Sequence, residues 1–258
     1  MDNLPVLIGV SRITDRSKNA PIRPSTFMAK AVEQAVNDLG GSVRLSGDVI
    51  TDVVTVRTAI EELLRPETPL TPYKNLPQQI VKLAGMDSDK QRYYHTSSGG
   101  NTPQYLVNTF AEKIAKGESE CVVIAGGELF KAFQDAAKTN QAPPQWGGAF
   151  EENLVTRPVD GVLGKVQGDV DGCNDVERKN KITAPRQIYP LLEQAHRADK
   201  KRPLNEHMTF MGEVFEKLNE VAGNVDNKAL SWFPQRRTAQ DISSEGPSNR
   251  WVSFPYTK

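Results

Sequence analysis

The chain has 258 residues with equal numbers of basic and acidic side chains, so its formal net charge is zero. A neutral chain has no overall field that would attract nucleic acid or an anionic membrane. No apolar run approaches the ~20 residues that a membrane-spanning helix needs. The two cysteines, Cys121 and Cys173, are too few for a disulfide framework. We therefore expect a globular protein of a reducing compartment, with no nucleic-acid partner and no membrane span.

The ends of the chain predict where the protein resides. Residues Met1–Pro5 have neither the basic region nor the long apolar region of a secretory signal. The last residues, Tyr256–Lys258, do not match the peroxisomal Ser-Lys-Leu signal. These features favour an intracellular, cytoplasmic location.

The first half of the sequence alternates strand and helix patterns. Leu4–Val10 is a nearly continuous apolar run, which is typical of a strand buried on both faces. A helix is predicted from Ser25, as N-cap, to Leu39, followed by a Gly-Gly stop. The other predicted elements of this half are strands over Val49–Val56, Arg92–Thr96 and Glu120–Ala125, and helices over Leu76–Leu83 and Pro103–Lys116. This alternation predicts an α/β fold with a largely parallel sheet covered by helices.

The pattern changes after about Lys138. Residues 139–183 are rich in Gly, Pro, Asn and Asp without sustained periodicity, so we expect excursions from the core there. Helices are predicted again over Arg186–Ala198 and Leu204–Ala222, and a loop-like tail follows with a short strand at Trp251–Phe254. We thus expect an α/β core over residues 1–130 and a loop domain with a helical insertion over residues 131–258.

The Gly-rich turn between the third strand and its following helix is the most informative stretch. Residues Ser97–Gln104 read SSGGNTPQ. The free N–H groups and the dipole of a helix start favour an anion or a developing oxyanion. Tight packing of the glycines explains the turn too, and spacing alone favours that structural interpretation. The turn has no Walker, dinucleotide-binding or nucleophile-elbow pattern.

Several motifs together resemble a known family. In chain order these are LPVLIGV at Leu4–Val10, SSGGNTPQYLVN from Ser97, AKGE at Ala115–Glu118, VIAGGE at Val123–Glu128, APRQIYP at Ala184–Pro190, WFP at Trp232–Pro234, SNR at Ser248–Arg250 and FPYTK at Phe254–Lys258. This series resembles the N-terminal half of the thiolase superfamily, in particular its sterol-carrier-type and thiolase-like branch, often labelled acetyl-CoA acetyltransferase. The resemblance implies the N-terminal half of a thiolase fold and, as ligand or substrate, a coenzyme A thioester without a further cofactor.

The resemblance also locates the nucleophile position. In a typical thiolase, a cysteine at the start of the central helix attacks the acyl-CoA thioester, helped by the helix dipole. That position falls on Gly100 here, and its neighbours Gly99 and Asn101 supply no thiol either. The His and Cys motifs of the family's second half are missing, so the chain looks truncated. We expect acyl-CoA binding without ordinary thiolysis.

Other residues are weaker candidates. His95 could serve as acid or base, although a satisfied histidine at a strand end is the commoner case. The polar side chains of Ser97, Ser98, Asn101 and Gln104 could bind a thioester or simply bond within the turn. By resemblance, the loop domain would hold coenzyme A through residues of its tail: Arg236, Arg237, Ser243, Ser244, Ser248 or Arg250.

The remaining titratable groups suggest no further site. Cys121 lies in an apolar strand and is expected to be inert. His196 and His207 fall on different helices without a second ligand at helical spacing, so we expect no metal site.

Three functions remain open at this point. The first is a thiolase-like acyltransferase or acyl-CoA-binding protein. The second is a non-catalytic interaction or regulatory fragment that docks on a full-length thiolase-like partner. The third and weakest is a nucleotide-binding domain. The resemblance also implies a homodimer, with Gln91–Thr96 as the strand at the dimer edge.

Overall fold

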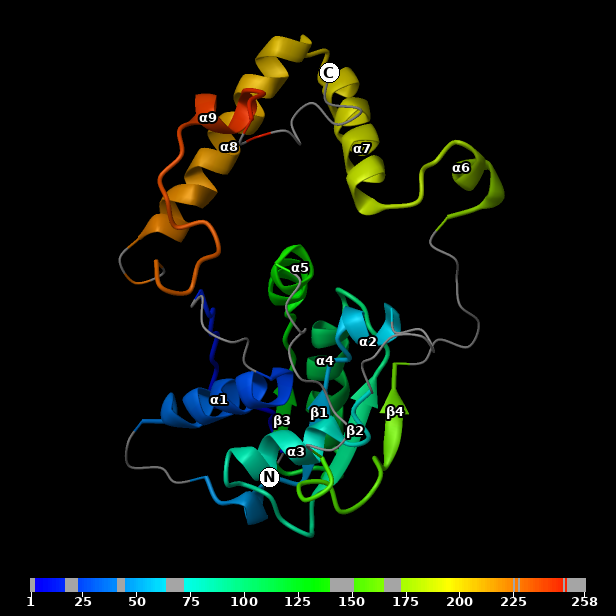
Figure 1. The fold of residues 1–258 in the computed structure, drawn as a ribbon, viewed down its shortest axis with the longest axis vertical. Helices are drawn as coiled ribbons and strands as arrows, with labels where there is room; N and C mark the ends of the chain where they lie inside the picture. Colours follow the sequence, from blue (N-terminus) through cyan, green and yellow to red (C-terminus); the bar gives the residue numbers. More distant parts are fainter. Residues whose placement is uncertain are drawn as a thin grey trace. The chain divides into compact units, whose positions relative to one another are not determined.

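The structure is a computed structural model that describes residues 3–16, 23–40, 45–63, 72–139, 151–164, 173–224, 226, 228–247 and 249 (Figure 1). The chain forms two compact units. Unit 1 spans Met1–Gln167 and unit 2 spans Gly168–Lys258.

A parallel four-stranded sheet forms the centre of unit 1. Its strands are β1 (Asp52–Thr55), β2 (Arg92–Thr96), β3 (Val122–Ala125) and β4 (Gly161–Leu163), in the order β3-β1-β2-β4. Every pairing in this sheet is parallel. The predicted α/β class is therefore confirmed, and the three strands predicted at these positions form.

Helices α1 (Pro24–Asn37), α3 (Leu76–Leu83) and α4 (Thr102–Ala115) cover the faces of this sheet (Figure 1). Unit 1 also contains the short α2 (Ala59–Leu63), α5 (Phe130–Lys138) and a 3₁₀ turn, η1, at Gly47–Val49. Because neighbouring residues of a strand point to opposite faces, Val53 packs with α1 and α3, whereas Val54 packs with Leu106 and Phe110 of α4. The sheet is thus sandwiched between α1 and α3 on one side and α4 on the other.

The helix starts differ slightly from the prediction. Ser25 is not the N-cap of α1, because Pro24 opens the helix and Ser25 is buried in its first turn. Proline suits this position because its missing N–H would have no partner in the helix. The start of α3 is capped by Asn75, whose side chain accepts a hydrogen bond from the Gln78 N–H at 3.0 Å.

The expected buried strand at Leu4–Val10 is wrong. This segment forms no strand, and Leu4, Val6 and Leu7 are 73–80% exposed. Its end is held against α1 instead: the Val10 backbone N–H donates to Asp38 at 3.0 Å, and the hydroxyl of the next residue, Ser11, donates to the Ala31 carbonyl at 2.6 Å. An apolar run alone does not make a strand, because a strand needs a neighbouring edge with which to pair.

Gly9 allows this segment to lie close to α1. A Cβ at Gly9 would stand 2.2 Å from the Ala35 carbonyl oxygen, which belongs to the helix backbone. We expect Gly9→Ala to destabilise the docked segment by about 1–3 kcal/mol and to speed its cleavage in limited proteolysis. Gly246→Ala is the matched control, because a Cβ at Gly246 meets no atom within 4 Å. Equal cleavage of the two variants would contradict the prediction.

The β2 strand lies inside the sheet, so the expected dimer edge at Gln91–Thr96 is wrong. β4 pairs with β2 in parallel, with Tyr94 opposite Gly161 and Thr96 opposite Leu163. This side of the sheet therefore has no free β2 edge for a second copy. β4 comes from residues 139–183, which were expected to lie outside the core, so that expectation is wrong for Gly161–Leu163. Its three residues are too few to show a period in the sequence.

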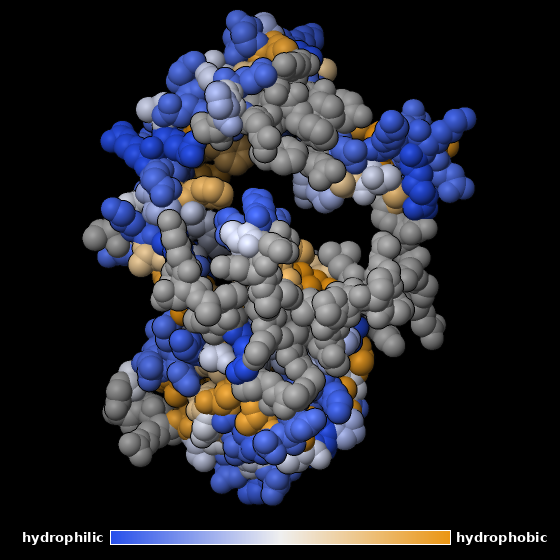
Figure 2. Space-filling model, in the orientation of Figure 1, coloured by the Kyte–Doolittle hydropathy of each residue, from blue (hydrophilic) through white to orange (hydrophobic). Residues whose placement is uncertain are grey.

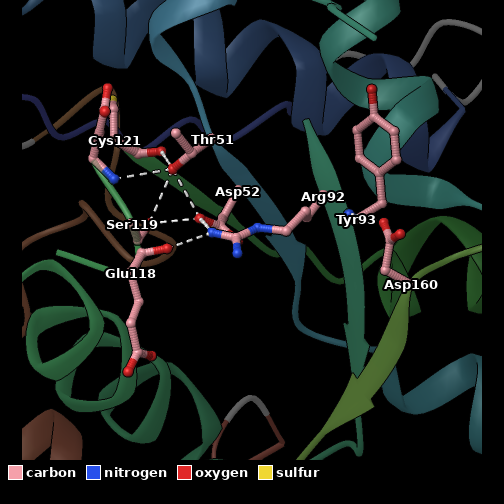
Figure 3. A network of polar contacts seen from close by, with 9 residues as sticks. Thr51, Asp52, Arg92, Tyr93, Glu118, Ser119, Cys121 and Asp160 are labelled. Atoms are coloured by element: carbon pink, nitrogen blue, oxygen red, sulfur yellow. Dashed lines mark hydrogen bonds and ion pairs between the residues drawn. The ribbon is translucent and has the colours of Figure 1, made fainter. Parts of the chain in front are cut away.

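A buried polar network joins β1, β2 and the loop before β3 (Figure 3). The carboxylate of Asp52 is fully buried and pairs with Arg92 at 2.7 Å. The hydroxyls of Ser119 and Thr51 donate to the same carboxylate oxygen at 2.5 and 2.8 Å. Arg92 also donates to the Glu118 carbonyl at 2.8 Å, and its pKa is raised chiefly by the hydrogen bond to Asp52. The network lies at the amino ends of the strands and ties three chain segments together.

Unit 2 is helical in the part of it that the structure describes. Its helices are α6 (Asp175–Lys179), α7 (Pro185–Asp199), α8 (Leu204–Gly223) and α9 (Ala239–Ser243). The predicted helices at α7 and α8 are confirmed, whereas α6 and α9 were expected to be loop. The predicted strand at Trp251–Phe254 lies outside the described residues.

Apolar side chains are exposed in unit 2, and orange residues lie at the surface in Figure 2. The largest exposed fractions belong to Trp232 at 76% and to Val176 and Tyr189 at 69% each, followed by Phe233 and Val221. Among all the helices described, none is both long and apolar enough to cross a bilayer.

Candidate functional site

Buried polar side chains gather at the carboxyl ends of β1 and β2. Thr55 and Thr96 are fully buried, and His95, Thr58 and Thr102 are at most 6% exposed. Ligands of open α/β sheets bind at the carboxyl ends of the strands, where loops and helix starts converge. This edge is therefore the candidate site of unit 1.

The Gly-rich turn is attached to the end of β4. The Ser97 N–H donates to the Leu163 carbonyl at 3.3 Å, and the Ser97 hydroxyl donates to the Gly164 carbonyl at 2.9 Å. Both groups of Ser97 are thus used within the fold. Ser98 is half-buried, and Gln104 is exposed and donates to Asn108 one helical turn further along α4. Asn101, the residue before α4, is exposed, and its side chain makes no capping hydrogen bond to the start of the helix.

Gly100 has open space around it. The residue is exposed, and a Cβ built there would meet no atom within 4 Å. A Cβ at the neighbouring Gly99 would instead stand 2.9 Å from the Thr102 hydroxyl. Room for a side chain or a ligand group therefore exists at position 100, next to the N-terminus of the 14-residue helix α4.

His95 is buried and uncharged near pH 7. Only 4% of the residue is exposed, and its Nδ1 lies 3.1 Å from the Thr55 hydroxyl. Burial, with a smaller contribution from the charge of Arg57, lowers the pKa of His95 to about 4. The ring is therefore neutral near pH 7 and is a poor base there. Its Nε2 has no hydrogen-bond partner among the described residues.

The structure separates His95 from the turn that follows it. Tyr94 packs with α4, whereas Tyr93 packs with α1 and α3. His95 shares the face of Tyr93 because side chains alternate along a strand. It therefore points toward the α1 and α3 side, whereas the Gly-rich turn leads to α4 on the opposite side.

Thr55 and Arg57 were missed from the sequence. Thr55 pairs with His95 in the β1–β2 register, and Arg57 follows β1, with its N–H donating to the Thr96 hydroxyl at 3.2 Å. No motif marks these residues, because their neighbourhood depends on the register between two strands nearly 40 residues apart. A polar residue ending an otherwise apolar strand was the one signal available in the sequence.

Two carboxyl groups of unit 1, those of Glu61 and Glu151, are also buried, and burial raises their pKa values. Glu128 is exposed, but partial desolvation raises its pKa as well. Glu61 accepts hydrogen bonds from the N–H and hydroxyl of Thr58, and Glu128 accepts one from the Ala59 N–H at 2.7 Å. Both therefore anchor the start of α2 directly after β1, which is a structural role.

The expected coenzyme A residues of the tail lie in unit 2. Arg236 is exposed, and Arg237 is half-buried with its N–H donating to Asn219 of α8 at 2.7 Å. Ser243 ends α9 and Ser244 follows it. Ser248 and Arg250 lie outside the described residues.

No group of three or more metal-binding side chains occurs in the described part of the chain. His207 is buried and its Nε2 lies 2.8 Å from Glu193, which joins α8 to α7. Burial raises the pKa of Cys121, in keeping with an inert thiol.

Comparison with known proteins supports the fold. The sequence matches no protein-family model and no curated protein. Among solved structures, the chain is similar to a monomeric SCP2-thiolase-like protein of type 1 from Mycobacterium smegmatis, with a TM-score of 0.58 and 22% sequence identity. The match covers 97% of this chain but 41% of that protein, so this chain spans less than half of its length. The parallel sheet with its covering helices is therefore a thiolase-like fold.

Proposed function

We propose that this chain is a thiolase-like protein that binds acyl-CoA without forming an acyl-enzyme. The observation that carries the proposal is Gly100, an exposed glycine with open space beside the start of α4, at the carboxyl edge of a thiolase-like sheet. The helix start favours the polarised oxygen of a thioester. A glycine offers no nucleophile, so the thioester would be held there and not cleaved.

The two thiols with described positions do not replace the missing nucleophile. Cys121 lies next to β3 at the amino end of the sheet, where its carbonyl accepts a hydrogen bond from the Thr51 backbone N–H at 2.9 Å. Cys173 belongs to unit 2, where Arg178 approaches its sulfur at 3.5 Å. Within unit 1, Cys121 lies at the opposite end of the strands from Gly100, which supports binding over covalent transfer.

Gly100→Cys is expected to create a reactive thiol. The helix dipole of α4 stabilises a thiolate at its N-terminus, so the thiol pKa falls. With acetyl-CoA, the thiolate would attack the thioester carbonyl carbon, the bond from that carbon to the coenzyme A sulfur would break, and the departing thiolate would take up a proton. Intact-protein mass spectrometry should show one added acetyl group in this variant and none in the wild type.

Gly246→Cys is the matched control, because Gly246 also has open space but lies in unit 2. Calorimetry should also detect binding of acetyl-CoA by the wild-type chain, weakened about tenfold or more in Gly100→Phe, which equals a loss of at least ~1.4 kcal/mol. Undetectable binding by the wild type, or equal acetylation of both cysteine variants, would refute the proposal.

A second function, an interaction module for a thiolase-like partner, rests on a different observation. The outer side of α4 exposes apolar side chains, with Tyr105 43% and Val107 47% exposed. A helix that covers a sheet in a closed domain is normally polar on its outer side. Pull-down of a full-length relative that is lost in Tyr105→Ser with Val107→Ser, while coenzyme A binding persists, would favour this second function.

A further inference from the structure

The side chains of Thr55 and His95 share a hydrogen bond between neighbouring strands. Thr55 is fully buried, and His95 Nδ1, at 3.1 Å, is the hydrogen-bond partner of its side chain in the described structure. A buried hydroxyl normally donates its proton to an acceptor. With the Thr55 hydroxyl as donor, His95 Nδ1 accepts and the ring proton resides on Nε2, which is the tautomer that the proposal below uses.

The proton on Nε2 has no acceptor among the residues that the structure describes. A buried donor without a hydrogen-bond partner costs folding free energy, and protein interiors rarely contain one unless a water or a ligand accepts its hydrogen bond. The same is true of the Arg57 Nε–H, which is also buried and without a partner in the described chain. Two unpartnered N–H donors thus occur close to the carboxyl ends of β1 and β2.

The two donors belong to one neighbourhood. Arg57 follows Thr55 by two residues, and Thr55 lies opposite His95 in the sheet. The Arg57 backbone is fixed by Thr96, the residue after His95, at 3.2 Å. The guanidinium is also near enough for its charge to lower the pKa of His95. Its charge also acts on the carboxylate of Glu61, although no ion pair of Arg57 occurs among the described residues.

We propose that Thr55, Arg57 and His95 form a binding site for an oxyanion, in which His95 Nε2–H and the Arg57 guanidinium donate hydrogen bonds to an oxygen of the ligand. The occupant is a group whose oxygens only accept hydrogen bonds, such as a carboxylate or a phosphate. Thr55 is a positioning residue, since it fixes the ring and its tautomer without touching the ligand. This site is distinct from the space at Gly100, because His95 points toward the α1 and α3 side of the sheet.

The tautomer gives a direct test in the wild-type protein. The chain has three histidines, so the NMR spectrum of ¹⁵N-histidine-labelled protein is simple. The signals that disappear in His95→Gln and in His196→Gln assign the resonances of these two rings, and the remaining signals belong to His207. We expect His95 to be the Nε2–H tautomer at pH 7. His207 is an internal reference for the same tautomer, because Arg202, which only donates, approaches its Nδ1 at 3.3 Å. An Nδ1–H tautomer at His95 would overturn the proposal.

Ligand titration tests the occupant. Acetate, inorganic phosphate and coenzyme A are added separately, and the His95 Nε2–H resonance should shift with at least one of them while His207 stays constant. A shift with acetate identifies a carboxylate, and a shift with phosphate or coenzyme A identifies a phosphate. If none of the three moves the resonance, a buried water completes the donor and the proposal is wrong.

Variants separate binding from folding. Arg57→Gln should weaken about tenfold the binding of whichever of the three probes shifts the His95 resonance, because a charge-assisted hydrogen bond is lost. Thr55→Val should mix the His95 tautomers, whereas Thr55→Ser keeps the hydroxyl and should preserve both the tautomer and the affinity within about twofold. A purely structural Thr55 would change thermal stability in both variants and leave the tautomer unchanged, which would also overturn the proposal.

Discussion

Replacing Asp52 by alanine is expected to lower the free energy of unfolding of unit 1 by about 3 kcal/mol. Asp52 is fully buried, and one of its oxygens receives hydrogen bonds from Arg92, Ser119 and Thr51. Removing one partner of a buried pair typically costs about 3–5 kcal/mol, because the other charge stays uncompensated. The side chain of Arg92 is 40% exposed, so water relieves part of that cost and the lower end of the range applies.

Hydrogen exchange at the amides of β1 measures this loss in unit 1 alone, whatever the stability of unit 2. Asp89→Ala is the matched control, since Asp89 is exposed, and it should change stability by about 0.5 kcal/mol or less. A double-mutant cycle that combines Asp52→Ala with Arg92→Met gives the interaction free energy between Asp52 and Arg92. A loss below about 1 kcal/mol in Asp52→Ala would show that the network does not hold the strands together.

Acid is expected to destabilise unit 1 through His95 by about 3 kcal/mol between pH 7 and pH 4. The pKa of His95 is about 4 in the folded protein, against its ordinary value of 6.5 in the unfolded chain. Between these values the unfolded chain binds a proton that the folded chain does not, so stability falls as pH falls. The difference between the two pKa values, at 1.36 kcal/mol per unit, gives the expected size.

Three carboxyl groups act in the opposite direction. The pKa values of Glu61, Glu128 and Glu151 are raised in the folded state, so their protonation favours folding as pH falls. The total pH profile of the wild type therefore mixes both effects. The contribution of His95 is the difference between the wild type and His95→Gln, which has no titrating ring.

Exchange at the amides of β2, measured from pH 7 to pH 4, gives both profiles. The wild type should lose about 3 kcal/mol relative to His95→Gln over this range. His196→Gln is the control, because His196 is exposed on α7, and it should follow the wild-type profile. Parallel profiles of the wild type and His95→Gln would mean that His95 is charged in the folded protein.

These two residues mark opposite ends of the same strands. The Asp52 network at the amino ends fixes the register of β1 with β2 and with the loop before β3 (Figure 3). The same register brings Thr55 beside His95 at the carboxyl ends. Loosening the network is therefore expected to disturb the candidate oxyanion site although no atom of the network touches it.

The sequence by itself determined the alternation of elements and the position of the Gly-rich turn. The predicted strand Arg92–Thr96 and helix Leu76–Leu83 have the bounds that the structure gives. Local periodicity and turn residues are sufficient for such elements, because each depends on neighbours within a few positions. The open position at Gly100 was likewise visible as a glycine before a helix.

Tertiary structure alone decided which elements pair and which side chains meet. Leu4–Val10 has a strand-like composition but forms no strand in the structure. The three residues of β4 carry no clear pattern, yet they pair with β2 and cover its edge. Thr55, Arg57 and His95 come together only through the β1–β2 register, because strand pairing links residues far apart in the chain and local sequence does not encode that register.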